Sequence, residues 1–417
     1  MANNMEIFEQ WESEIRAYCR AAPTVFKSAS NAKQVDENGK EYVDFFAGAG
    51  VLNFGHNNPK MKEAMIEFLK EDGVAHSLDM YTSAKRSFIE KFVETILKPR
   101  NMKYKMQFTG PTGTNAVEAA LKLARRVTGR ENVVAFTHGF HGMTLGSLAC
   151  TANQYFRNAA GVSLDNVIRW PFGIGENCME SLEDLKAMFN DPSSGVNPPA
   201  AFLVETIQAE GGVRVGKEEW LKGVQQLAKD LGALFIIDDI QVGCGRTGSY
   251  FSFDDMDLDP DIVVLAKGIG GYGTPLAMTL NKPEYDKKWS PGEHTGTFRG
   301  QGLSFVAGAK ALEYFDNDDL MNQTKENGKY MFEFLTDLAS GRNDVEVRGK
   351  GMIIGFDVSD GDKGKAIAGE CFKNGMLIGG CGKGGEVLKF IPPLTTPKED
   401  LQKGLEIFAS AYKKVIG

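Results

Sequence analysis

The chain of 417 residues lacks the features that mark several large classes of protein. No run of 18 apolar residues occurs, and this excludes an ordinary membrane-spanning helix. Lysine and arginine do not cluster, and the net charge of −8 gives no basic face for nucleic acid. The sequence also contains no internal repeat and no low-complexity tract. We therefore expect neither nucleic acid nor a membrane as a partner.

Cysteine is sparse, with six residues and no C-x-x-C pair, which fits neither a disulfide framework nor a zinc site. His138 and His141 are spaced like helical metal ligands, but Gly139 and Gly142 interleave with them, so we predict no metal site. Residues 5–20 read as a charged amphipathic helix rather than as a secretion signal. The expected location is the cytoplasm.

The chain is too long for one ordinary core, and its apolar runs alternate with helical patterns. This alternation predicts an α/β fold with a mostly parallel sheet flanked by helices. A long helical pattern after residue 301 indicates a second, smaller α+β domain. The predicted division is 1–72 for an N-terminal segment of the small domain, 73–320 for the large domain and 321–417 for the rest of the small domain. The clearest apolar runs are residues 133–136, 200–205, 233–238 and 262–267.

Two of these runs end in opposite charges, the first in Asp238 and the second in Lys267. Ligands of open α/β sheets bind beyond the carboxyl ends of the strands, so both side chains are candidates for one ligand site. A pyridoxal phosphate enzyme needs a lysine for its Schiff base and a carboxylate that keeps the pyridine nitrogen protonated. Asp238 and Lys267 would supply both groups.

Such an enzyme also needs a phosphate site and flat contacts for the cofactor ring. A short strand at 106–110 is followed by a Gly/Thr/Asn turn and an Ala/Leu-rich helix, whose first N–H groups can bind an anion. A helix merely capped by Thr or Asn would give the same pattern. Phe140 and Ile240 are candidates for the two ring faces. The turn contributes Gly113, Thr114 and Asn115.

Six motifs in order resemble those of class III, or ω-amino, aminotransferases from about residue 20 to the C-terminus. Residues 238–248 resemble the D-E-x-Q-x-G-x-G-R-T-G signature, and residues 205–212 resemble E-P-x-Q-G-E-x-G. The other matches are residues 113–118, Phe140-His141-Gly142, Lys267-Gly268 and residues 294–298. The resemblance implies the type I fold of pyridoxal-phosphate-dependent transferases.

The resemblance also implies a role for each matching residue. Lys267 would carry the Schiff base and move the proton, and Asp238 would pair with the pyridine nitrogen. Gln241 would bond the ring hydroxyl, with Ile240 and Phe140 on the two ring faces. The remaining cofactor-binding residues would be Gly113, Thr114, Asn115, His141, Glu205 and Thr297.

Thr297 would complete the phosphate site of a neighbouring subunit, so the resemblance implies a homodimer or a higher homo-oligomer with shared sites. Glu210 matches a residue that pairs with a basic group and gates between two substrates. Many relatives have Arg where this chain has Met143, and Arg where it has Lys389. Lysine cannot provide the bidentate contact of arginine, so substrate carboxylates must be bound differently. Arg299 is a replacement candidate, and it could equally be a surface charge.

Within the family, the motifs around residues 108–115, 238–241, 297–301 and Lys389 most resemble the diaminobutyrate–2-oxoglutarate branch of ectoine biosynthesis. That branch transfers the amino group of L-glutamate to L-aspartate 4-semialdehyde. An ω-aminotransferase for ornithine, acetylornithine or 4-aminobutyrate is the alternative. A more remote alternative is a nicotinamide-dependent dehydrogenase, since residues 268–273 match the dinucleotide motif G-x-G-x-x-G. No helix pattern follows the motif, and this makes the alternative remote.

Overall fold

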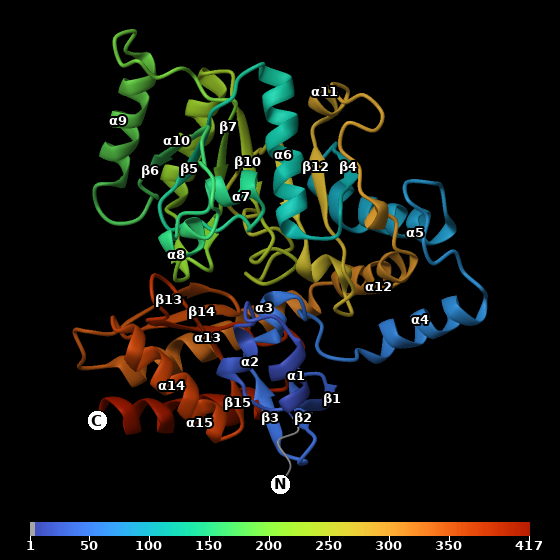
Figure 1. Ribbon diagram of the computed structural model, residues 1–417, viewed down its shortest axis with the longest axis vertical. Coiled ribbons are helices and arrows are strands. Elements are labelled where there is room, and N and C mark those ends of the chain that lie inside the picture. The colour runs from blue at the N-terminus through green and yellow to red at the C-terminus, as the bar shows by residue number, and fades with distance from the viewer. Residues whose placement is uncertain (1–4) are drawn as a thin grey trace.

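The computed structural model describes residues 5–417 and consists of a larger and a smaller body (Figure 1). The larger body is built on a seven-stranded sheet with the order β4-β12-β11-β10-β7-β5-β6. Only β12 runs antiparallel to its neighbours. The strands are β4 (Lys105–Phe108), β5 (Val133–Phe136), β6 (Val167–Trp170), β7 (Ala201–Val204), β10 (Leu234–Asp238), β11 (Ile262–Leu265) and β12 (Met278–Asn281).

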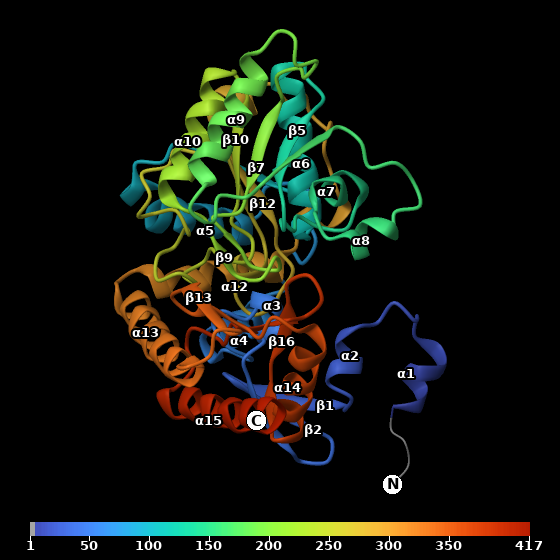
Figure 2. The ribbon, with the colours of Figure 1, turned by 90° about the vertical axis from the view of Figure 1, so that its left-hand side faces the viewer.

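Both faces of this sheet are covered by helices, with α6 on one side and α9 and α10 on the other (Figure 2). Alternate residues of β10 therefore enter different apolar cores: Phe235 and Ile237 join one, Leu234 and Ile236 the other. Burial on both faces explains why the strands read as continuous apolar runs. The elements around the sheet are α5 (Ser83–Phe92), α6 (Gly113–Thr128), α7 (Leu145–Cys150), α8 (Gln154–Asn158), β8 (Ile207–Gln208), β9 (Arg214–Val215), α9 (Cys178–Asn190), α10 (Glu218–Asp230), α11 (Pro283–Asp286) and α12 (Gly302–Leu312).

The smaller body joins segments from both ends of the chain, and strand β3 pairs in parallel with β15. Its sheets have the orders β1-β2-β3-β15 and β13-β14-β17-β16, and they share an apolar core with the last helices. The predicted α/β fold is confirmed, while the boundaries at residues 72 and 320 stay a prediction. The elements are β1 (Phe26–Ser30), β2 (Lys33–Asp36), β3 (Glu41–Asp44), β13 (Glu346–Lys350), β14 (Ile353–Asp357), β15 (Met376–Leu377), β16 (Gly379–Cys381), β17 (Val387–Phe390), α13 (Asp319–Ala339), α14 (Gly361–Lys373) and α15 (Lys398–Ile416).

The predicted helix over 5–20 is wrong in extent. The structure has two short helices instead, α1 (Glu6–Trp11) and α2 (Tyr18–Ala21). Glu12 is already extended, and neither helix buries a residue, so no tertiary packing stabilises a longer one. The remaining elements are α3 (Ala47–Gly50), α4 (Pro59–Lys70) and the short helical turns Val93–Leu97, Lys98–Arg100, Lys267–Gly270, Thr297–Arg299 and Glu313–Phe315. Among the described helices, none has the length and apolarity that crossing a membrane requires.

Arg246 ties the larger body to the smaller one. Its side chain is fully buried, and it donates hydrogen bonds to the carbonyl oxygens of Met352 and Pro392 and to Oδ1 of Asn53. These acceptors come from both ends of the chain. Burial lowers the pKa of Arg246 to about 9. A guanidinium held by neutral oxygens therefore fixes how the two bodies meet.

Replacing Arg246 by methionine is expected to lower the free energy of unfolding by about 3 kcal/mol, because three buried acceptors lose their donor. Urea denaturation followed by circular dichroism measures the change. Arg342→Met is the matched control, since the Arg342 side chain is 34% exposed and its guanidinium bonds Asp344, two residues further along the chain. Equal midpoints for the two variants would contradict the role of Arg246.

Candidate active site

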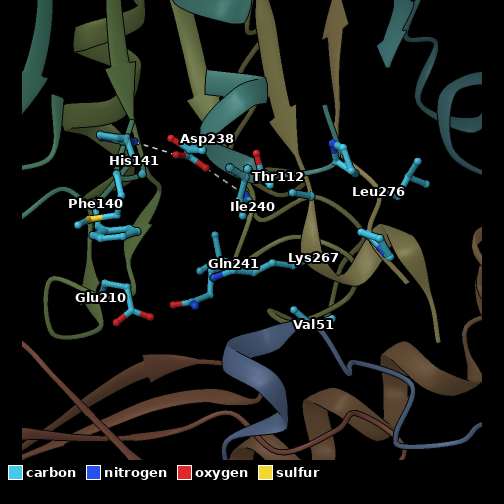
Figure 3. A pocket seen from close by; sticks show the side chains of 18 of the residues that line it. Val51, Thr112, Phe140, His141, Glu210, Asp238, Ile240, Gln241, Lys267 and Leu276 are labelled. Atoms are coloured by element: carbon cyan, nitrogen blue, oxygen red, sulfur yellow. Dashed lines mark hydrogen bonds and ion pairs between the residues drawn. The ribbon is translucent and has the colours of Figure 1, made fainter. Parts of the chain in front are cut away.

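A cavity of ≈ 430 Å³ lies beyond the carboxyl ends of β10 and β11 (Figure 3). The two strands pair in parallel, with Asp238 opposite Val264, so their charged ends reach the same edge of the sheet. Asp238 and Lys267 both line the cavity, as the sequence pattern predicts. Parallel pairing thus brings together a carboxylate and an amine that are 29 positions apart in the sequence.

Lys267 is a strained and buried lysine. It opens the 3₁₀ turn Lys267–Gly270 with a φ of 53°, a conformation that residues other than glycine rarely adopt. Burial lowers the pKa of Lys267 to about 8, although the nearby Glu210 carboxylate opposes this shift. A substantial part of the amine is therefore neutral, and nucleophilic, near neutral pH.

Asp238 is held by two donors at the floor of the cavity. Its Oδ2 lies 2.8 Å from Nδ1 of His141, and its Oδ1 accepts the backbone N–H of Ile240 at 3.2 Å. His141 is buried, and its own backbone N–H bonds Oγ1 of Thr151. The imidazole therefore orients the carboxylate, and among the described residues no cluster suited to a metal includes it.

Glu205 is a second buried carboxyl group at the same floor. Burial raises its pKa well above the usual range, and the neighbouring Asp238 adds to the shift. Its oxygens accept the backbone N–H groups of Phe140 at 2.9 Å and of Ala209 at 3.3 Å. Glu205 thus positions the loop that carries Phe140 into the cavity.

The N-terminus of α6 offers an anion cradle. Gly113 and Thr114 line the cavity, and a Cβ at Gly113 would lie 2.8 Å from Cδ1 of Ile240. A side chain at this position would have to displace Ile240. Asn115 lies differently: Thr112 caps its N–H, and its side chain accepts the N–H of Gly110, so it does not line the cavity. The role of Asn115 in phosphate binding stays a prediction.

A polar network connects the cavity to strand β17 of the smaller body. Lys389 on β17 forms an ion pair with Glu210 and donates to Oε1 of Gln241 at 3.0 Å. Gln241 in turn donates from Nε2 to the carbonyl oxygen of Ala49 at 2.8 Å. Burial disfavours the charged form of Glu210, but Lys389, Lys267 and the hydrogen bond with Gln241 together outweigh it and lower the pKa of Glu210 to about 2. Burial also disfavours the charged form of Lys389, but the Glu210 carboxylate favours it, and the pKa of Lys389 is raised.

Two predicted residues lie away from the cavity of their own chain. Arg299 forms an ion pair with Asp79, and the carbonyl oxygen of Thr297 lies 2.8 Å from Nε2 of His76. Both belong to an exposed region beside Phe298, whose side chain is 61% exposed. Their proposed contacts with phosphate and substrate stay predictions.

The structure adds cavity residues that the motifs did not indicate: Val51, Thr112, Thr274, Pro275 and Leu276. The last three follow the glycine turn 268–273, which leads into β12. In the described chain no helix begins at that turn, as a dinucleotide loop would require. The Thr274-Pro275 pair after the turn was the only available sign of this arrangement.

The donor set of the cavity fits pyridoxal phosphate. A buried amine, an oriented carboxylate and a glycine at a helix N-terminus match the aldehyde, the pyridine nitrogen and the phosphate of that cofactor. Phe140 and Ile240 line the space between these groups. The residues can therefore bind the cofactor through each of its polar ends.

Comparison with known proteins agrees with this site. The profile of class III aminotransferases matches residues 17–412. A diaminobutyrate–2-oxoglutarate transaminase of Halalkalibacterium halodurans is 47% identical over 99% of this chain and 97% of its own, and one of Wolinella succinogenes is 49% identical over the same shares.

Solved structures show the same fold at low identity. The ornithine aminotransferase of Toxoplasma gondii ME49 has a TM-score of 0.85 at 24% identity, covering 99% of this chain and 94% of its own. A transaminase of the marine bacterium Virgibacillus has a TM-score of 0.88 at 19% identity, covering 99% and 98%. Class III aminotransferases depend on pyridoxal phosphate and act on small molecules. The chain belongs to the class III aminotransferase family.

Proposed function

We propose that this aminotransferase moves the amino group of L-glutamate to L-aspartate 4-semialdehyde, giving L-2,4-diaminobutyrate and 2-oxoglutarate. One observation carries the proposal: relatives named for this activity are 45–49% identical over nearly the whole chain. The reaction would be the first step of ectoine biosynthesis. The six cysteines are free, in keeping with a reducing cytoplasm as the location.

Different residues of the site would orient the cofactor, move the proton and bind the substrates. Pyridoxal phosphate, when bound, supplies an electron sink for the substrate carbon that loses its proton. Lys267, as a neutral amine, would accept that proton and return it on the cofactor side. Asp238, oriented by His141, would keep the pyridine nitrogen protonated. Glu210 and Lys389 alternate between pairing with each other and binding the two substrates.

Rebinding of pyridoxal phosphate to the apoenzyme is expected to depend on pH through Lys267. With a pKa of about 8 in place of 10.5, roughly a tenth of the amine is neutral at pH 7, and only the neutral amine attacks the aldehyde. The rate should rise about tenfold per pH unit below pH 8 and level off above it. Stopped-flow absorbance from pH 6.5 to pH 9.5 measures this profile, with phosphate-free pyridoxal as the control for titration of the phosphate. A rate still rising about tenfold between about pH 8.5 and pH 9.5 would place the pKa at the ordinary value.

Lys389→Ala is expected to raise the KM for glutamate and for 2-oxoglutarate by about 10- to 100-fold, because a carboxylate of the substrate would lose the buried cation proposed to bind it. Lys389→Arg keeps the charge and should stay within a few-fold of the wild type. Steady-state kinetics against each dicarboxylate gives the values. An unchanged KM in Lys389→Ala would remove Lys389 from substrate binding.

We also propose that the active unit is a homodimer or a higher homo-oligomer with shared sites. Thr297 lies outside the cavity of its own chain, on an exposed segment that could reach a partner's phosphate site. Arg299 is carried on the same turn. Mixing inactive Lys267→Ala chains with inactive Thr297→Ala chains tests the proposal, because shared sites predict that activity returns in the mixture.

An amino-acceptor screen with glutamate as donor tests the proposed function. We expect the highest kcat/KM with aspartate 4-semialdehyde. Equal or higher values with glutamate semialdehyde or succinic semialdehyde would instead assign the protein to the ornithine, acetylornithine or 4-aminobutyrate branch of the family.

A further inference from the structure

A second cavity adjoins the active site on the far side of Phe140 and Glu210, which line both. Its volume is ≈ 880 Å³. One wall is the loop after β5, and the facing wall is the glycine-rich segment 379–385 of the smaller body. The backbone N–H of Gly382 donates to the carbonyl oxygen of Glu210 at 2.9 Å. The segment therefore sits directly against a residue of the active site.

This second cavity is lined by positive charge. Arg169, Lys365 and Lys383 contribute cations, and Glu210 is the one carboxylate in its lining among the described residues. Glu210 is already paired with Lys389. Burial lowers the pKa of His138 in the same wall, and Arg214 and Lys383 lower it further. The space is thus suited to an anion.

Of the three cations, Lys383 is the one available to a ligand. Arg169 is fixed by the carbonyl oxygens of Ala149 at 2.7 Å and Cys150 at 2.9 Å. Lys365 lies 3.6 Å from the carboxylate of Asp362. For the side-chain amine of Lys383, the described residues provide no ion-pair partner. The nearby Glu386 is engaged instead by the backbone N–H groups of Lys383 at 2.9 Å and Gly384 at 2.8 Å.

The segment that carries Lys383 is rich in glycine and packs closely against Glu386. Gly382 and Gly385 have φ values of 93°, and a Cβ at Gly382 would lie 2.6 Å from Oε1 of Glu386. Asn153 donates to the carbonyl oxygen of Lys383 at 3.4 Å across the cavity. Glycines on both sides allow the lysine to face the cavity without a bulky neighbour.

The active-site cavity itself has too few cations for a dicarboxylate. Lys267 is the lysine that lines it, and the expected cofactor would occupy that amine. Lys389 lies behind Glu210 and lines neither cavity, so it can bind one carboxylate only when Glu210 releases it. Met143 offers no charge, and Arg299 is paired with Asp79 in its own chain. Glutamate and 2-oxoglutarate carry two carboxylates, so within one chain a second cation has to come from outside this cavity.

We propose that Lys383 binds the second carboxylate of the dicarboxylate substrates, with Lys389 binding the first, and so favours them over monocarboxylates. This inference rests on the proposed function, because it assumes a donor and a product with two carboxylates. It assigns the second cavity as a substrate subsite and Lys383 as a specificity-determining residue.

Binding of unreactive acids to the holoenzyme tests the proposal without turnover. We expect Lys383→Gln to weaken the binding of glutarate by about fivefold and to leave the binding of butyrate unchanged, as measured by calorimetry. Lys383→Arg should bind glutarate like the wild type. Lys365→Gln is the matched control, since it removes a charge from the same cavity at a residue already paired.

Two results would overturn the assignment: a change of less than twofold for glutarate, or equal weakening of glutarate and butyrate. The absorbance of the bound cofactor checks that each variant is folded and loaded. Failure of the proposed function would show differently, because the wild type would then fail the aspartate 4-semialdehyde assay whatever the glutarate binding of Lys383→Gln.

Discussion

Lys267→Ala is expected to lower kcat/KM by at least about 10⁴-fold, because in the proposed function this one residue would supply both the covalent link to the cofactor and the proton transfer. The structure offers no substitute among the described side chains of the cavity. Lys389 is the nearest alternative lysine in the network, and it is held by Glu210 and Gln241. Steady-state transamination with glutamate as donor measures the loss.

Two controls separate chemistry from folding in this experiment. Lys282→Ala removes a lysine after β12 that pairs with Asp259 and Asp261, outside the cavity, and should keep full activity. Added methylamine should restore part of the activity of Lys267→Ala, because a free amine can move the proton. Residual activity within about 100-fold of the wild type would contradict the assigned role.

Asp238→Asn is expected to lower kcat by about 10²–10³-fold, because a neutral amide cannot stabilise a protonated pyridine nitrogen. The side chain keeps its size, so the cavity is preserved. The amide can still contact Nδ1 of His141, which lies 2.8 Å from Oδ2 of Asp238. Single-turnover measurements with glutamate report the rate of the proton-transfer step directly.

The adjacent Asp239 provides a matched control for this substitution. It is also buried, but it bonds Ser252 and does not line the cavity. Burial raises the pKa of Asp239 well above the usual range. Asp239→Asn therefore exchanges a carboxyl group for an amide without removing a charge from the cofactor site. We expect it to lower kcat by less than about tenfold. Equal losses of kcat in the two variants would show that the charge of Asp238 does not determine the rate.

The fold was predictable where local pattern determines it. The apolar runs before Asp238 and Lys267 became the buried parallel strands β10 and β11, since strands covered on both faces must be apolar throughout. The helix starting at Gly113 followed from its turn and its Ala/Leu pattern. The length of the N-terminal helix was overestimated, because its apolar side chains are not buried against the rest of the chain.

The site was predictable only in part, because motifs identify residue types and not their partners. Asn115 matched a phosphate loop, yet its side chain accepts the N–H of Gly110. Arg299 was a candidate for a carboxylate and is paired with Asp79. The second cavity joins His138 to the loop around Lys383, about 245 positions later in the sequence, and no local pattern predicts such a contact.

The central claim is that Lys267, and no other lysine, holds the cofactor. Borohydride reduction of the holoenzyme makes the link permanent, and mass spectrometry of the digested protein locates it. We predict a single phosphopyridoxyl group on the peptide that contains Lys267, and none in the Lys267→Ala variant. The same group found on Lys389, or on any other lysine, would contradict the account.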